Sequence, residues 1–156
     1  MSRTFAFLAT IVSFCADPVV AETLVGKWYC ELGDEHLEIA GIGEYFADGR
    51  VEMAAQTSGQ KDGITLEAEM TMTGTWQLDG EVFTDTAETI KIEMLRLNGK
   101  NVAGSAFGKD LAETMIRNDG EADFLRFPSE GKVHFIGVSS GTITTCYRKQ
   151  SDYLGS

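Results

Sequence analysis

The stretch Ile64–Leu78, ITLEAEMTMTGTWQL, alternates between two kinds of residue along its whole length. Its even-numbered positions are apolar or small: Ile64, Leu66, Ala68, Met70, Met72, Gly74, Trp76 and Leu78. Its odd-numbered positions are threonine, glutamate and glutamine. Because side chains of a β-strand point alternately to opposite faces, this pattern predicts a strand with one buried face, and no helix would produce it.

A strand of this length cannot run straight through a small domain. Fully extended, it would reach about 50 Å, which is too long for a domain of this size. We expect the strand to bend at Gly74, because a glycine inside a strand often marks a corner. Long strands that coil at a glycine are what a small closed barrel requires.

Turn sequences divide the rest of the chain at short intervals. They are Asp48-Gly49, Asp62-Gly63, Asp79-Gly80, Asn98-Gly99, Asp119-Gly120, Glu130-Gly131 and Ser140-Gly141. Asp-Gly and Asn-Gly suit tight hairpins, in which both central residues need a positive φ. The further strands predicted between the turns lie near 25–32, 36–47, 50–57, 81–86, 89–97, 122–128, 132–138 and 142–149. This spacing predicts an all-β fold, an antiparallel up-and-down β-barrel of about eight strands.

One segment has the period of a helix instead of that of a strand. Apolar residues recur at every fourth position from Phe107 to Met115, which predicts a short amphipathic helix within 105–118. Ser105 or Asp110 could cap its start.

The first residues have the order of a secretory signal peptide. Arg3 supplies a positive start, and an uncharged apolar run extends from Phe5 to Ala16. Small residues at Val19 and Ala21 form a cleavage site, so we expect residues 1–21 to be removed. As a helix the apolar run would span about 18 Å, against roughly 30 Å of bilayer hydrocarbon.

Export predicts a periplasmic or secreted protein with no membrane span. The sequence contains no Asn-x-Ser/Thr glycosylation site, which favours a bacterial periplasm. The alternatives for the apolar run are a buried core helix and an uncleaved anchor.

The three cysteines fit the same expectation. Cleavage would remove Cys15 and leave Cys30 and Cys146, an even pair in an oxidising compartment. We expect these two to form a disulfide, and closing so long a loop would stabilise the fold by roughly 4–5 kcal/mol. The alternative is a pair of unrelated buried thiols.

Size and charge narrow the class of protein. Removing 21 of the 156 residues leaves 135, which suits a single domain over residues 22–156. The formal net charge is −11. Such a surface repels phosphate backbones and anionic lipid headgroups, so we expect neither nucleic-acid binding nor electrostatic membrane binding. A basic protein partner would suit it.

The segment Leu24–Tyr29, LVGKWY, resembles the opening of lipocalins and related calycin barrels. In that superfamily a Gly-x-Trp on the first strand packs across the closed end of the barrel. A basic residue near the end of the last strand covers the tryptophan, by cation–π stacking on the indole face. The resemblance assigns these closure positions to Gly26, Trp28 and Arg148.

Two further segments, 44–49 (EYFADG) and 74–80 (GTWQLDG), look like small bacterial lipocalin-like domains. The chain lacks the Thr-Asp-Tyr motif expected late in a lipocalin barrel, and its predicted helix precedes the last strands. The resemblance therefore implies a calycin-like barrel and not membership of the lipocalin family. Closure of such a barrel pairs the first and last strands, which would place Cys30 opposite Cys146.

The sequence carries no motif that indicates catalysis. His36 could be imagined in a metal site with Asp34 and Glu38, but a structural site usually needs four ligands, so we interpret this segment as a solvated loop. His134 alternates with apolar neighbours, and no nucleophile elbow is present. We therefore expect a non-enzymatic protein with no metal or cofactor. A barrel enzyme that pairs His134 with a carboxylate is the weakest alternative.

Met70, Met72 and Trp76 are the candidate ligand-binding residues. Methionine is flexible and polarizable, so it often lines cavities that accept varied apolar ligands. A barrel of about eight strands either packs its interior with side chains, which is the ordinary role for these residues, or leaves room for one small ligand.

We therefore expect an exported protein that binds a small apolar or amphipathic molecule in the mouth of the barrel. The alternative is a protein-partner module, such as a periplasmic inhibitor or immunity protein that neutralises a toxin or hydrolase. Such a module would use the predicted loops at 33–36 and 57–63.

Overall fold

The computed structural model describes residues 23–33, 36–118, 120 and 122–148. The predicted signal peptide, residues 1–21, lies outside the described residues. The strands are β1 (Gly26–Gly33), β2 (Leu37–Tyr45), β3 (Arg50–Lys61), β4 (Ile64–Asp79), β5 (Val82–Leu97), β6 (Lys100–Asn101), β7 (Asp123–Ser129), β8 (Lys132–Gly137) and β9 (Ile143–Tyr147). The helix α2 spans Ala106–Asn118, between β6 and β7.

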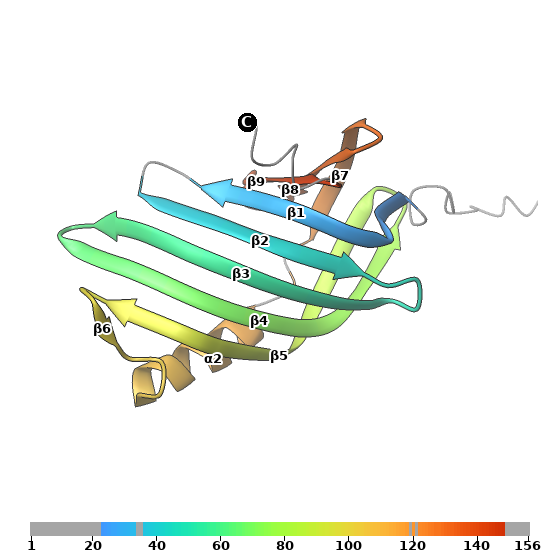
Figure 1. The fold of residues 1–156 in the computed structure, drawn as a ribbon. Coiled ribbons are helices and arrows are strands. Elements are labelled where there is room, and N and C mark those ends of the chain that lie inside the picture. The colour runs from blue at the N-terminus through green and yellow to red at the C-terminus, as the bar shows by residue number, and fades with distance from the viewer. Residues whose placement is uncertain (1–22, 34–35, 119, 121, 149–156) are drawn as a thin grey trace, which may run out of the picture.

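Eight of these strands form a closed ring (Figure 1). The order is β4-β3-β2-β1-β9-β8-β7-β5, and β5 pairs back onto β4. Every pairing is antiparallel, and chain neighbours lie side by side around the ring. The predicted fold, an up-and-down barrel of about eight strands with one short helix, is confirmed.

The first and last strands meet at a short seam. β1 and β9 share a register of three residue pairs, in which Cys30 lies opposite Cys146. The two cysteines form a disulfide across a sequence separation of 116 residues. The predicted bridge between the first and last strands is therefore confirmed.

The register between β4 and β5 shifts at Gly74, the position where the sequence predicted a bend. A Cβ atom at Gly74 would collide with the carbonyl oxygen of Thr86 on β5, so no larger residue fits there without movement. β5 runs unbroken from Val82 to Leu97, although the sequence predicted separate strands at 81–86 and 89–97. The gap between the two predicted strands falls at this bulge, where Glu88 has no opposite residue in β4.

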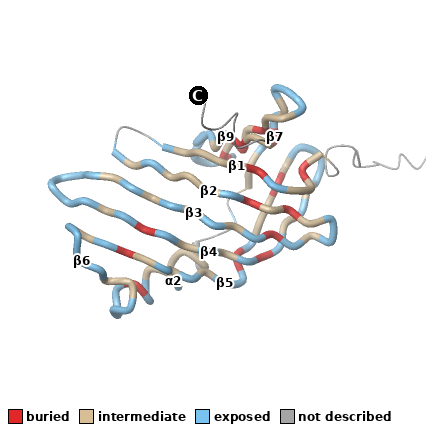
Figure 2. The backbone as a smooth tube through the Cα atoms, in the orientation of Figure 1, coloured by how far each residue is buried: buried red, intermediate tan, exposed pale blue. Residues whose placement is uncertain are grey.

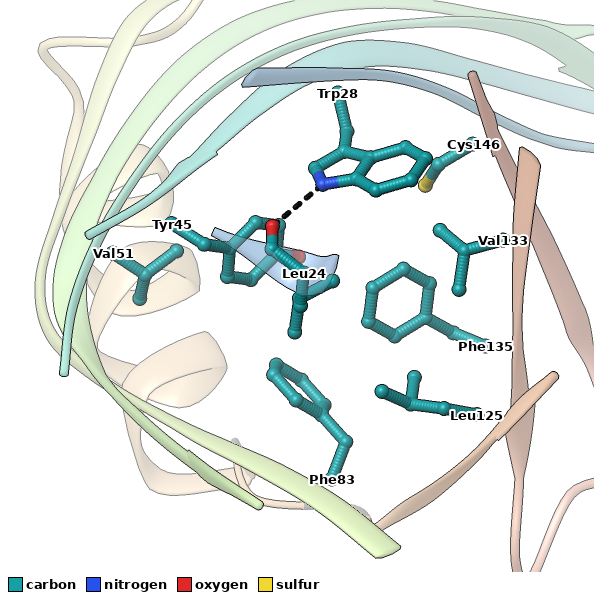
Figure 3. Close-up of a cluster of buried hydrophobic side chains, with 9 residues drawn as sticks. All are labelled: Leu24, Trp28, Tyr45, Val51, Phe83, Leu125, Val133, Phe135 and Cys146. Carbon is teal, nitrogen blue, oxygen red and sulfur yellow. Dashed lines mark hydrogen bonds between the residues drawn. The ribbon is translucent and has the colours of Figure 1, made fainter. Parts of the chain in front are cut away.

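The main cluster of buried side chains is gathered at one end of the ring. Its members are Leu24, Trp28, Tyr45, Val51, Phe83, Leu125, Val133, Phe135 and Cys146. Figure 3 shows these side chains converging within the ring of strands, and Figure 2 shows most buried segments at the end of the long strands that adjoins β7–β9. We call this the closed end.

Aromatic rings fill the closed end. Tyr45 lies 5.8 Å from Phe83 and 6.1 Å from Phe135, and Phe83 lies 5.1 Å from Phe135, measured between ring centroids. Trp76 adds a fourth ring, 6.0 Å from Tyr45. We call Tyr45, Trp76, Phe83 and Phe135 the aromatic plug.

Beyond the plug, β1–β5 continue as a curved sheet, which we call the open half (Figure 1). Most inner-facing side chains here are only half-buried, namely Leu32, Ile39, Met53, Met70, Met72, Ile90 and Ile92, whereas Ala68 of β4 and Leu95 of β5 are buried. The predicted loop at 57–63 is shorter than expected, because β3 runs to Lys61 and only Asp62 and Gly63 form the turn. The loop at 33–36 is partly outside the described residues.

The helix α2 packs chiefly against β5. Ser105 caps its start, since the Ser105 Oγ accepts a hydrogen bond of 3.3 Å from the backbone N–H of Gly108. Phe107, which the helical period placed on the apolar face, is 53% exposed, because the helix covers one strand and not a broad sheet. Within the described residues no helix is long and apolar enough to cross a membrane.

Candidate functional site

The closed end is sealed by the residues that the resemblance singled out. The Arg148 guanidinium carbon lies 4.0 Å from the centroid of the Trp28 ring. Trp28 donates its indole N–H to the carbonyl oxygen of Leu24 at 2.7 Å, and Arg148 donates to the carbonyl oxygen of Thr23. Desolvation by burial lowers the pKa of Arg148 below its ordinary value. The charged group is thus held against the indole and a backbone carbonyl.

An apolar hollow lies on the inner wall of the open half, and we call it the inner groove. Its volume is about 220 Å³. Its lining comes from β1, β2, β3 and β9: Cys30, Glu31, Leu32, Ile39, Gly41, Ile42, Gly43, Tyr45, Met53, Ala54, Ala55 and Thr144. The groove thus runs from the disulfide at the seam to the edge of the aromatic plug.

Two glycines explain why the wall is hollow here. In the sheet register, Gly41 lies between Cys30 of β1 and Ala55 of β3, and Gly43 lies between Trp28 and Met53. Because these inner positions of β2 carry no side chain, the backbone of β2 forms the floor. The disulfide on one side and Met53 on the other rise above it.

A neutral hydroxyl lies at the deep end of the groove. A Cβ atom built on Gly43 would lie 3.5 Å from the hydroxyl oxygen of Tyr45, so this oxygen is close to the groove floor. Burial raises the pKa of Tyr45 far above its ordinary value, and the nearby carboxylates of Asp85 and Asp123 raise it further. The hydroxyl therefore stays protonated over the physiological range.

The three predicted ligand residues lie on the inner face of β4, and the structure separates them. Met72 lies opposite Met53 in the β3–β4 register, beside the wall of the inner groove. Met70 lies opposite Ala55, one step further from the plug. Trp76 belongs to the aromatic plug, and its indole N–H donates to the carbonyl oxygen of Phe46 at 3.1 Å. None of the three is among the residues that line the groove.

The sequence prediction therefore missed the residues that shape the inner groove. Met53 is the methionine that lines it, and Gly41 and Gly43 give it its depth. The signal was present in the sequence as two glycines spaced by two residues within one predicted strand. At that spacing both glycines face the same side, so they remove two adjacent side chains from one wall.

Neither histidine lies in the groove lining. His134 sits on β8 between the buried Val133 and Phe135, so it faces out of the barrel, and it lies opposite Arg126 in β7. His36 directly precedes β2. Among the residues that the structure describes, no group of three or more His, Cys, Asp and Glu residues is placed to hold a metal ion.

The fold and the groove define a class of protein: a small antiparallel β-barrel, plugged at one end and bridged at its seam, with an apolar hollow on its inner wall. A scan against protein-family models finds no match to the chain, and a search of the curated proteins finds none. The functional proposal therefore depends on the geometry of the barrel.

Proposed function

We propose that this protein is an exported, non-enzymatic, calycin-like binding protein that holds one small apolar or amphipathic molecule in its inner groove. The observation that carries the proposal is the hollow of about 220 Å³ beside Cys30 and Met53. Its walls are the half-buried inner side chains of the open half, which a ligand would remove from water. Burial of apolar surface is worth roughly 25 cal/mol per Å².

The groove sets the size and chemistry of the ligand. Sites for drug-sized ligands commonly measure about 300–1,000 Å³, so a groove below that range suits one alkyl chain or a small ring. Met53 can adapt its side chain to different shapes. The neutral Tyr45 hydroxyl offers one hydrogen-bonding group at the deep end, so a ligand with a single polar end fits better than a charged one.

Two further features support the calycin-like and exported character. The Arg148–Trp28 stack is the closing contact that the resemblance implies. The Cys30–Cys146 disulfide suits an oxidising compartment, such as a bacterial periplasm. These two features support a barrel that binds a ligand, and neither of them points to a catalysed reaction.

Titration with a neutral fluorescent probe, N-phenyl-1-naphthylamine, tests the proposal on the purified protein. Ala55 lies on the inner face opposite Gly41, so Ala55→Leu would fill the groove. The preceding residue, Ala54, borders the groove through its backbone, but its side chain is exposed on the outer face, so Ala54→Leu adds the same volume outside the barrel. We expect the wild-type protein and Ala54→Leu to bind the probe, and Ala55→Leu to bind it at least about tenfold more weakly.

Two results would contradict the proposal. One is equal probe binding by Ala55→Leu and the wild-type protein, with both variants shown to be folded by their thermal transitions. The other is no probe binding by the wild-type protein together with no co-purifying small molecule in native mass spectrometry.

A further inference from the structure

The outer face of the long strands carries a second hollow, distinct from the inner groove, which we call the outer trough. It consists of two adjoining depressions of about 430 and 310 Å³. Ala40, Gln56 and Glu69 line both depressions, so the two form one continuous surface across β2, β3 and β4.

The floor of the outer trough mixes apolar side chains, Tyr29, Ala40, Ile42 and Ala54, with the polar Gln56, Ser58 and Thr71. The sheet register places Tyr29, Ile42 and Ala54 in one row across the outer faces of β1, β2 and β3. Ala40 lies in the next row. The alanines leave the hollow, while Ile42 remains 39% exposed beside it. A partner that packs on the apolar part of this floor would remove the exposed surface of Ile42 from water.

The rim of the outer trough is acidic. Its carboxylates are Glu38, Glu67, Glu69 and Glu93, all on exposed residues. Glu67 pairs with Arg96 at 3.3 Å and Glu93 pairs with Lys91 at 2.7 Å. Glu38 and Glu69 have no ion-pair partner among the described residues.

We propose that the outer trough is a docking surface for a basic, partly apolar segment of another protein. The long apolar stem of a lysine or arginine would pack on Ala40 and Ala54, and its charge would reach Glu69. The Tyr29 ring at the end of the same row offers a face for a second cation. The net charge of −11 would attract such a partner from a distance and repel an anionic lipid surface.

The outer trough and the inner groove lie on opposite faces of the same piece of sheet, and Gly41, Ile42, Ala54 and Ala55 line both hollows. Successive residues of β3 serve the two sites, because the Ala54 side chain faces outward and Ala55 faces inward. A partner in the outer trough therefore leaves the inner groove accessible. Ala55→Leu should weaken binding of the probe in the inner groove and spare peptide binding, whereas Ala54→Leu should weaken peptide binding and spare the probe. Failure of one proposal can therefore be told from failure of the other.

Calorimetric titration with a synthetic peptide of alternating lysine and leucine tests the docking surface on the full chain. We expect Glu69→Gln to weaken binding by about threefold to tenfold, as for one charge pair at an interface rim. Ala54→Leu, which fills the floor, should weaken binding at least as much. An alternating lysine–serine peptide should bind more weakly than the lysine–leucine peptide, because it lacks the apolar contact.

Two matched variants provide the controls. Glu130→Gln removes the same charge at the turn between β7 and β8, outside the trough, and should leave binding unchanged. Ala55 borders the trough only through its backbone, so Ala55→Leu, whose side chain points to the inner face, should also leave it unchanged. Equal weakening by Glu130→Gln and Glu69→Gln would mean diffuse attraction to an acidic protein and would overturn the proposal. Unchanged binding by Ala54→Leu, or no binding by the wild-type protein, would overturn it as well.

Discussion

Gly26 lies directly against the guanidinium of Arg148, which in turn stacks on Trp28. Its φ is +113°, and a Cβ atom there would lie 2.6 Å from the Arg148 Nη1. Gly26→Ala should therefore strain the backbone and displace Arg148 from the indole, lowering the free energy of unfolding by about 1–3 kcal/mol. Denaturant unfolding followed by tryptophan fluorescence measures this loss.

Gly104→Ala is the matched control for that substitution. A Cβ atom at Gly104 meets no atom within 4 Å, so the change should alter stability by no more than about 0.5 kcal/mol. If Gly26→Ala proved as harmless as Gly104→Ala, the closed end would not depend on this close approach.

The raised pKa of Tyr45 predicts how the stability of the folded protein changes at alkaline pH. Its pKa is raised by burial and by the nearby Asp85 and Asp123, so above pH 10 the folded protein holds a proton that the unfolded chain loses. The stability that Tyr45 contributes is thus complete below about pH 10 and is lost as the pH rises, at up to about 1.4 kcal/mol per pH unit. Tyr45→Phe keeps the aromatic ring and removes the hydroxyl group that ionises.

Denaturant midpoints measured from pH 8 to pH 11 test this linkage. We expect the wild-type protein to lose stability more steeply than Tyr45→Phe above pH 10, and the two to fall in parallel below it. Parallel curves over the whole range would show that the Tyr45 hydroxyl is accessible to water and ionises normally.

At the scale of single residues, the sequence predicted contacts that depend on unusual residue types. The resemblance to calycin barrels assigned Trp28 and Arg148 to the closing contact, and the even pair of cysteines left after residue 21 indicated the bridge. The inner groove was not predicted, because it is shaped by missing side chains at Gly41 and Gly43. Which glycine opens a cavity and which merely permits a turn depends on the register of neighbouring strands, which no single segment contains.

At the scale of elements, the barrel depends on its shortest pairings. β1 and β9 share only three residue pairs, and the disulfide lies in the middle one. Replacing both Cys30 and Cys146 by alanine should lower the free energy of unfolding by roughly 4–5 kcal/mol, the loop-closure value for a separation of 116 residues. Urea unfolding with and without a reducing agent measures it.

The double alanine variant also supplies the control. Reducing agent should destabilise the wild-type protein and leave the variant unaffected. A wild-type protein equally stable when reduced would mean that the core at the closed end holds the seam without the bridge.

Element boundaries were predicted best where the alternation was regular. β4 was predicted at 64–78 and spans Ile64–Asp79, because every second residue faces the core side. β5 was predicted in two pieces because the bulge at Glu88 shifts its alternation by one residue. The two-residue strand β6 was missed, since its pairing with the end of β5 leaves no pattern in so short a segment.

At the scale of the whole molecule, the buried cluster and the binding surfaces lie toward opposite ends of the barrel and meet at Tyr45, which belongs to the plug and lines the groove. The buried cluster and the aromatic plug lie at the closed end, whereas the inner groove and the outer trough lie on the open half. The closed end can therefore fix the shape of the sheet, while the half-buried inner side chains beyond it remain available to a ligand. The sequence indicated the ring but not this division, because the alternating pattern is equally regular at both ends of β4.

This division predicts a gradient of amide hydrogen exchange along single strands. β3 is the clearest case, because it pairs with β2 on one edge and β4 on the other along almost its whole length. The two ends of β3 therefore have the same backbone hydrogen bonding but differ in burial. Val51 is 1% exposed at the closed end, while Gln60 and Lys61 are exposed at the far end.

Because local opening costs least where few apolar side chains are buried, amides at 58–61 should exchange at least about tenfold faster than amides at 51–54. Exchange followed by NMR resolves single amides, and the same order should hold in β2, with Ile39 faster than Gly43. Uniform protection along both strands would show that the barrel opens only as one cooperative unit. Saturating the inner groove with the fluorescent probe should slow exchange in the open half and leave the closed end unchanged, because a ligand stabilises the conformation that binds it.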